Sequence, residues 1–211
     1  MLKKLLLTSL IALSATIAQA DTLTVNKDYN KIEVNPTSVI AEPKEGKPLL
    51  IEFFWYGCPH CYHMEPMVKK LVEERKDQID FVRYPAVFPR WTSGAQLFFT
   101  LEQMGLSEKL HDKVFDTIQS KKINIMDDKK KRDQFLQENG VDVAEFDKIY
   151  SSFGINNKVN QAKEISLAYK LDSSPSFIIN NTYQFTPGLN GSYEKTIEVM
   201  NVMLDNLKEK K

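Results

Sequence analysis

The sequence predicts an α/β fold in which a central β-sheet is flanked by helices and interrupted by an inserted helical block. Short apolar runs at residues 49–54, 79–84 and 176–179 have the length and composition of buried strands. Helical spacing of apolar residues follows the first run, which predicts a strand–helix–strand unit. Residues 93–170 show helical periodicity, so we expect several helices to separate the second run from the third.

The composition fits one compact domain or a domain with an insertion. The chain has 211 residues, of which 42% are apolar and 27% are charged, enough to bury a sizeable core. Basic and acidic residues number 28 each, so the charge gives no reason to expect a nucleic-acid partner. Two cysteines are the only source of thiol chemistry.

The N-terminus has the pattern of a secretory signal. Lys3 and Lys4 precede an apolar stretch at residues 5–18, and the small residues Ala18-Gln19-Ala20 suit cleavage. We therefore expect residues 1–20 to be removed after Ala20, which leaves about two more negative than positive charges. No other stretch is long and apolar enough for a membrane span. An exported protein of this kind lies in a compartment where disulfides persist.

The mature chain begins with weak strand and loop signals. Residues 21–34 are polar apart from a loose alternation that ends at Val34, which predicts an edge strand. Prolines and a glycine between residues 36 and 48 predict a loop that leads into the central strand, Leu49–Phe54. A helix follows Gly57, and residues 79–84 form the next strand. About 25 intervening residues then make a right-handed parallel crossover.

Five apolar stripes at helical spacing fill residues 93–170. We expect the first to end at Gly105, the third at Asn139 and Gly140, and the fourth at Gly154. Their aromatic members are expected to be core residues. The stripes are Leu97, Phe98, Leu101 and Met104; Leu110, Val114 and Ile118; Phe135 and Leu136; Phe146, Ile149, Tyr150 and Phe153; and Val159, Ala162, Ile165 and Tyr169.

A hairpin and a last helix close the chain. Ser174 and Pro175 precede the strand at residues 176–179, and residues 183–185 form its partner. Asn180 and Asn181 supply the tight turn between them because asparagine tolerates positive φ. Apolar residues between positions 193 and 207 predict an amphipathic helix.

Cys58 and Cys61 lie where the central strand ends and a helix begins. Unpaired N–H groups and the positive end of the helix dipole favour a thiolate at Cys58. Pro59 suits the first turn, where its missing N–H has no consequence, and His60 can give the Cys58 sulfur a hydrogen bond or a positive charge. A stabilised thiolate makes the disulfide oxidising, with Cys61 as the resolving partner. The motif therefore predicts a redox-active disulfide, without a metal or another cofactor.

Other uses of the two cysteines have weaker support. A disulfide that closes a loop this short contributes only about 2 kcal/mol, which makes a poor structural staple. A zinc site would need a second pair of ligands, and away from the crowded His60 and His63 only His111 is available. A c-type haem requires histidine directly after the second cysteine, where Tyr62 stands.

Residues 52–62, Glu-Phe-Phe-Trp-Tyr-Gly-Cys-Pro-His-Cys-Tyr, resemble the signature of the DsbA family of exported thiol oxidases in the thioredoxin superfamily. Pro66 matches the proline that kinks the active-site helix of the superfamily. The resemblance extends over the mature chain and implies a thioredoxin fold with a mixed sheet. It implies a thioredoxin-like domain at residues 21–92 and 171–211, an inserted helical domain at residues 93–170, and a periplasmic location.

The resemblance implies roles for further residues. Pro175 matches the cis-proline that faces the cysteines and helps bind substrate as an added strand, and Ser174 stands where well-known members carry valine. Glu52 matches a buried acid that shuttles protons to Cys61, although a satisfied or edge-facing carboxylate is the alternative. Arg83 is expected as its counter-charge, able to orient Glu52 but not to relay a proton.

Phe185 and Pro187 match positions that line the hydrophobic groove beside the active site of the family. Exposed apolar residues there would hold unfolded chains without sequence preference. Core packing is the alternative for Phe185.

The resemblance implies an oxidase that donates the Cys58–Cys61 disulfide to reduced, newly exported proteins. A membrane-bound, quinone-linked partner similar to DsbB would then re-oxidise it. A disulfide isomerase or reductase and a non-enzymatic holdase for unfolded proteins are the alternatives. Fewer than about 30 mature residues precede the central strand, which leaves no room for the dimerisation domain of DsbC-like isomerases, and we expect a monomer.

Overall fold

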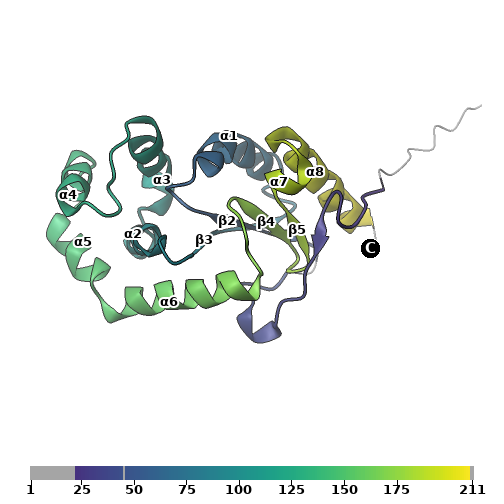
Figure 1. Cartoon of the computed structure of the whole chain (residues 1–211), viewed down its shortest axis with the longest axis horizontal. Helices are drawn as coiled ribbons and strands as arrows, with labels where there is room; N and C mark the ends of the chain where they lie inside the picture. The colour runs from purple at the N-terminus through teal and green to yellow at the C-terminus, as the bar shows by residue number, and fades with distance from the viewer. Residues whose placement is uncertain (1–21, 45, 210–211) are drawn as a thin grey trace, which may run out of the picture.

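A mixed five-stranded β-sheet forms the centre of the computed structural model (Figure 1). The structure describes residues 22–44 and 46–209, and the predicted signal sequence lies outside the described residues. The order across the sheet is β1-β5-β4-β2-β3; β2 and β3 are parallel, and the other neighbouring pairs are antiparallel. The strands are β1 (Asn30–Lys31), β2 (Leu49–Phe54), β3 (Asp80–Pro85), β4 (Ser176–Ile179) and β5 (Tyr183–Phe185).

The central strand β2 has the predicted bounds, and all its side chains are buried. Its alternate residues reach opposite faces of the sheet. Leu50 packs with α1 (Pro59–Glu74) and α8 (Tyr193–Glu209), whereas Ile51 packs with α6 (Phe153–Ala168). Figure 1 shows the same arrangement, with α1 and α8 over one face and α6 along the other. Because both faces are covered, the strand is apolar almost throughout.

The crossover and the hairpin are confirmed. β2 and β3 are parallel neighbours, and their register places Glu52 beside Arg83. In the hairpin, Asn180 and Asn181 adopt φ angles of 49° and 54°, which asparagine tolerates in a tight turn. Asn180 also accepts a hydrogen bond from the backbone N–H of Leu49 at 2.8 Å, which ties the turn to the start of β2.

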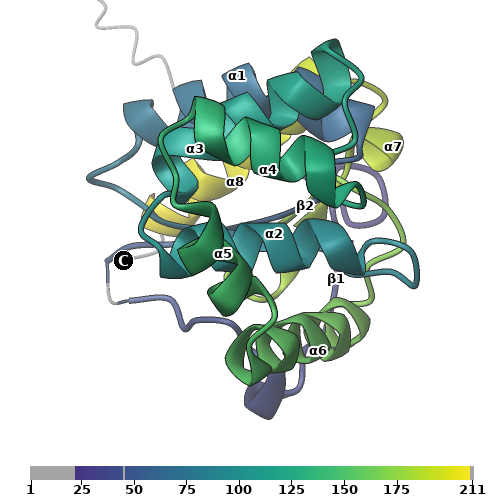
Figure 2. The ribbon, with the colours of Figure 1, turned by 90° about the vertical axis from the view of Figure 1, so that its left-hand side faces the viewer.

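A block of helices occupies most of residues 93–170, the segment whose apolar residues show helical spacing. Figure 2 looks onto the end of the molecule where α2 to α5 gather. Their core also includes Phe54, Tyr56, Cys58 and Cys61, so the block packs directly against the cysteine motif. The division into two domains at residues 93 and 170 stays a prediction. The elements are α2 (Thr92–Gln103), α3 (Ser107–Phe115), the π-helical turn Asp116–Ser120, α4 (Lys129–Glu138), α5 (Val143–Tyr150) and α6.

One predicted helix end is wrong. Phe153 and Gly154 belong to the start of α6, not to the end of the preceding helix, which stops at Tyr150. The hydroxyl of Ser152 accepts a hydrogen bond from the N–H of Ile155 at 3.2 Å and caps α6. Phe153 is consequently 80% exposed, not part of the core stripe. The serine that caps α6 therefore indicates where this helix begins better than the spacing of the aromatic residues does.

Two short elements complete the architecture: a 3₁₀ turn, Pro36–Ser38, and the helical turn α7, Pro187–Asn190. Within residues 22–44 and 46–209, no helix combines the length and the apolar character needed to cross a bilayer.

Candidate active site

Cys58 is the N-cap residue of α1, directly after the turn that leaves β2. Its backbone N–H donates to the Trp55 carbonyl at 2.9 Å and closes that turn. A Cβ atom on Gly57 would lie 2.3 Å from the Trp55 ring, so only glycine fits between them. Pro59 occupies the first position of the helix, as predicted from its missing N–H. Cys61 follows one turn into the helix, and both cysteines are buried free thiols.

The two thiols differ strongly in acidity. The Cys61 thiol lowers the pKa of Cys58 to about 6 by hydrogen bonding to its thiolate, against the opposing effect of burial. The backbone N–H groups of Cys61 and His60 contribute in the same direction. For Cys61 itself, burial and the neighbouring Cys58 raise the pKa well above its ordinary value. The first sulfur is therefore a thiolate near neutral pH, and the second stays protonated.

The predicted hydrogen bond from the His60 ring to Cys58 is not present. His60 Nδ1 lies 2.6 Å from the hydroxyl of Tyr193, at the start of α8, and the ring is exposed. The electrostatic effect of its ring contributes to the lowered pKa of Cys58, but less than the hydrogen bonds from the Cys61 thiol and from the backbone N–H groups do. Sequence reasoning missed Tyr193 because it lies more than 130 residues away in the chain.

Ser174 contacts both cysteines. In the thiol form, Cys58 Sγ donates to the backbone carbonyl of Ser174 at 3.1 Å, and Cys61 Sγ lies 3.0 Å from the Ser174 hydroxyl. The peptide bond between Ser174 and Pro175 is cis, the geometry that the resemblance implies. The loop before β4 therefore faces the cysteine motif with one carbonyl and one hydroxyl.

Three charged side chains form a buried cluster beneath α1. Arg83 Nε donates to Glu52 at 2.7 Å, and Arg83 Nη2 donates to Glu65 at 2.8 Å. The predicted pairing of Glu52 with Arg83 is thus confirmed. Glu52 points to the same face of the sheet as Leu50 and Phe54, the face that α1 covers. Burial raises the pKa of Glu52 and of Glu65, although Arg83 opposes the shift in both.

Sequence reasoning also missed Glu65 and His111. Glu65 is only 6% exposed and lies one helical turn after Cys61, so a charge on the apolar stripe of α1 was the available signal. His111 occupies the buried stripe of α3 together with Val114 and Phe115, and its Nε2 lies 3.5 Å from Glu65 Oε2. The helical block thus completes the buried cluster.

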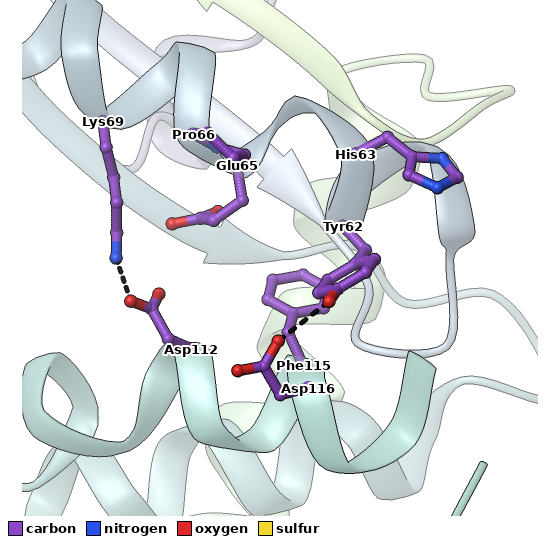
Figure 3. A pocket seen from close by; sticks show the side chains of 8 residues that line it. All are labelled: Tyr62, His63, Glu65, Pro66, Lys69, Asp112, Phe115 and Asp116. Atoms are coloured by element: carbon purple, nitrogen blue, oxygen red, sulfur yellow. Dashed lines mark hydrogen bonds and ion pairs between the residues drawn. The ribbon is translucent and has the colours of Figure 1, made fainter. Parts of the chain in front are cut away.

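Figure 3 shows the space between α1 and α3 on the outer side of this cluster. It is a cavity of about 480 Å³ that Glu65 and Pro66 border from α1. Asp112 of α3 binds Lys69 across it, and Tyr62 donates to Asp116 at 2.9 Å. The buried carboxylate of Glu65 thus borders an open recess.

A second cavity, of about 540 Å³, lies on the other side of the cysteine motif. Ser174, Pro175 and Pro187 line it together with His60 and Tyr193. Pro187, at the start of α7, is therefore placed beside the motif, in line with its expected position in a groove.

The expected groove position of Phe185 is wrong. Its side chain is fully buried, and it belongs to the core formed with Phe177 and Met200. Position 185 lies in β5, where the strand's alternation turns its ring inward under α8. The alternative of core packing is the correct one.

The described residues contain no group of three or more histidine, cysteine, aspartate or glutamate side chains that could hold a metal ion. The two cysteine sulfurs have the chemistry for electron transfer by thiol–disulfide exchange.

Comparisons with known proteins agree with this chemistry. Residues 49–193 match the family described as DSBA-like thioredoxin domain. The chain is 33% identical to the thiol:disulfide interchange protein DsbA of Pseudomonas aeruginosa over 208 residues, covering 97% of this chain and 96% of that protein. It is 37% identical to DsbA of Pseudomonas syringae over 198 residues, covering 93% and 89%. The crystal structure of Pseudomonas aeruginosa DsbA superposes with a TM-score of 0.78 at 32% identity, covering 90% of this chain and 97% of that one. The chain belongs to the DsbA family of the thioredoxin superfamily.

Proposed function

We propose that this DsbA-family thiol:disulfide oxidoreductase is an exported oxidase that donates a Cys58–Cys61 disulfide to reduced proteins during their oxidative folding. The main support is the difference between its two thiols. The pKa of Cys58 is lowered to about 6, while that of Cys61 is raised. A thiolate that is stable at neutral pH favours the dithiol form, so the corresponding disulfide is a strong oxidant.

The exchange takes place in two steps. A substrate thiolate attacks Cys58 Sγ of the disulfide, a mixed disulfide forms, and Cys61 leaves as a thiolate that takes up a proton. A second substrate thiolate then attacks the substrate sulfur of the mixed disulfide, and Cys58 leaves as a stable thiolate. The substrate loses two electrons and two protons and gains a disulfide, and the cysteine pair gains the two electrons.

Cys61 is the harder leaving group because its pKa is high. The Ser174 hydroxyl, 3.0 Å away, is placed to donate a hydrogen bond to its developing charge. Glu52 is our candidate for the proton supply, since its raised pKa allows it to hold a proton closer to neutral pH. Arg83 positions Glu52 and cannot itself exchange a proton, because its guanidinium stays charged.

The cavity beside the cysteine motif is our candidate substrate groove. The carbonyl of Ser174, next to Pro175, is free to accept an N–H from an extended substrate once Cys58 no longer donates to it. Pro187 adds apolar surface at the far wall. Contacts of this kind use backbone groups and apolar surface, which suits a broad range of reduced, unfolded exported proteins.

An oxidase of this type needs a partner that restores its disulfide. We propose a membrane-bound, quinone-linked re-oxidase resembling DsbB, and a periplasmic location reached through cleavage of residues 1–20. The redox group of the protein is its own cysteine pair.

The deciding experiment is the equilibrium of the purified protein with reduced and oxidised glutathione. We expect the Cys58–Cys61 disulfide to be more oxidising than glutathione disulfide. A disulfide that is harder to reduce than glutathione disulfide would refute the oxidase and favour a reductase.

A second assay separates the oxidase from a holdase. The oxidised protein is mixed with a reduced, unfolded protein that contains cysteines, and both disulfide formation and aggregation are followed. Cys58→Ser should abolish disulfide formation. If the variant formed disulfides at the wild-type rate, the assignment of Cys58 would be wrong. If the wild type suppressed aggregation without forming disulfides, the holdase would be the correct function.

A further inference from the structure

A buried row of polar groups runs from Glu65, under α1, to the turn before Cys58, and the exchange steps above do not use it. Glu65 Oε2 lies 3.5 Å from His111 Nε2, and His111 Nδ1 lies 3.0 Å from the hydroxyl of Tyr56. His111 and Tyr56 are only 3% and 1% exposed, so both side chains are buried. The row links the charged cluster to the turn through a residue of the helical block.

The His111 ring is hydrogen-bonded at Nδ1 and not at Nε2. Among the described residues, Glu65 Oε2 and His111 Nε2 have no hydrogen-bond partner, and they approach each other to 3.5 Å without forming a hydrogen bond. The contact of His111 Nδ1 with the Tyr56 hydroxyl, at 3.0 Å, is therefore the bond that holds the ring and the tyrosine together. Burial lowers the pKa of His111 to about 3 and raises the pKa of Tyr56, so the ring is neutral and the hydroxyl keeps its proton.

Several charged groups face the His111 ring, but only Glu65 approaches its hydrogen-bonding atoms. The others act over longer distances, and their effects on the ring have opposite signs, since carboxylates favour the charged ring and cations disfavour it. Aromatic rings of Phe54 and Phe115 pack against its edges and faces. The facing groups are Glu52 of β2, Arg83 of β3, Glu65 and Lys69 of α1, and Asp112 of α3.

Tyr56 is held at both ends by the helical block. Gln119, in the π-helical turn, donates from Nε2 to the Tyr56 carbonyl at 2.8 Å, and the Tyr56 hydroxyl shares a hydrogen bond with His111 Nδ1. Two residues further on, the N–H of Cys58 closes the turn onto Trp55. Hydrogen bonds from α3 and the π-helical turn thus hold the backbone that carries the reactive sulfur, in addition to the bond within the motif. The two contacts of Tyr56, with Gln119 and with His111, are called the clamp below.

We propose that His111 is a positioning residue for disulfide exchange: by holding Tyr56 it fixes the turn that directs the Cys58 sulfur toward the N–H groups of His60 and Cys61. This inference rests on the proposed function, because it takes Cys58 as the sulfur that exchanges with substrate. His111 touches neither sulfur. When the clamp is released, the turn gains freedom and those N–H groups stabilise the thiolate less well.

Tyr56→Phe tests the clamp without making a cavity, since it removes the hydroxyl and keeps the ring. We expect the acid dissociation constant of Cys58, measured from thiolate absorbance against pH, to fall about three- to tenfold, the equivalent of one net hydrogen bond. The disulfide should become less oxidising toward glutathione as a consequence. Tyr62→Phe is the matched control, because it removes a neighbouring hydroxyl that binds Asp116 outside the row. It should leave the titration of Cys58 unchanged.

His111→Gln provides the second arm. Its amide can occupy the place of Nε2 but offers no polar atom at the place of Nδ1, so the Cys58 titration should move as far as it does in Tyr56→Phe. The double variant should show no larger shift, since both changes break the same contact. Urea unfolding of each variant confirms that it is folded.

Two outcomes would overturn the role of His111. The first is a Tyr56→Phe variant in which Cys58 titrates as it does in the wild type. The second is a double variant in which the shift of the Cys58 pKa is the sum of the shifts in the two single variants. The Cys58 titration tests the contact between His111 and Tyr56 whether or not the wild-type protein oxidises glutathione. The wild-type glutathione equilibrium, in turn, tests the proposed function independently of His111.

Discussion

The low pKa of Cys58 predicts that the reduced protein gains stability with rising pH and that the oxidised protein does not. The folded-state pKa is about 6, against an ordinary value of 9.0. A group whose pKa is depressed by folding stabilises the fold at high pH, and this contribution is lost as the pH falls through the folded-state pKa. In the disulfide form the sulfur does not titrate, so the contribution is absent.

The magnitude follows from these two pKa values. One pKa unit corresponds to about 1.4 kcal/mol. Linkage between 9.0 and about 6 gives about 2.5 kcal/mol of added stability at about pH 8 and almost none at about pH 5. Cys61 does not offset this gain, because its pKa is raised and it stays protonated in that range. Carboxylates and histidines titrate in both redox forms, so they largely cancel in the difference between them.

Urea unfolding of the reduced and the oxidised protein between about pH 5 and about pH 8 measures this difference. We expect the unfolding free energy of the reduced form to rise by about 2.5 kcal/mol relative to the oxidised form. The reduced Cys58→Ser variant is the control, and its pH dependence should follow that of the oxidised protein. A difference that stays constant with pH would refute a thiolate at Cys58. The same rise in Cys58→Ser would assign it to another group.

Two further predictions concern the surroundings of the cysteines. Arg83→Met leaves Glu52 and Glu65 buried without their counter-charge, so the unfolding free energy should fall by about 3–5 kcal/mol at neutral pH, and less in acid, where the carboxylates are protonated. Arg83→Lys should lose less, and equal losses in urea unfolding would contradict the charge pairing of Arg83 with the two carboxylates. Ser174→Val removes the hydroxyl beside Cys61 and should slow the formation of the mixed disulfide, followed by acid quenching, about two- to tenfold. An unchanged rate would show that the hydroxyl does not assist the departure of Cys61.

The parts of the fold with strong local signals were predictable from the sequence. An apolar run as short as Leu49–Phe54 favours a buried strand over a helix, and the paired asparagines after β4 favour a tight turn because asparagine tolerates positive φ. The pairing of Glu52 with Arg83 was also predictable, because a parallel crossover of adjacent strands brings equivalent positions into register.

The remaining parts of the site depend on packing between distant segments. Tyr193 binds His60, and His111 meets Glu65, only because α8 and α3 pack beside α1. No pattern within 20 residues of the motif indicates these contacts. Phe185 illustrates the opposite problem, since an apolar residue near a groove can equally well face inward, and the packing of α8 against the sheet decides which.

The placement of Ser174 relates the ionisation of Cys58 to substrate binding. Its carbonyl accepts the Cys58 S–H in the dithiol, and neither a thiolate nor a disulfide has a proton to donate. The oxidised protein therefore has this carbonyl free for a substrate N–H when it meets a reduced substrate. We propose that, after exchange, a Cys58 thiolate close to the same carbonyl adds negative charge where a substrate strand would bind. The group proposed to bind the substrate in the oxidised form would thus become less favourable for binding once the disulfide has been transferred, which would assist product release.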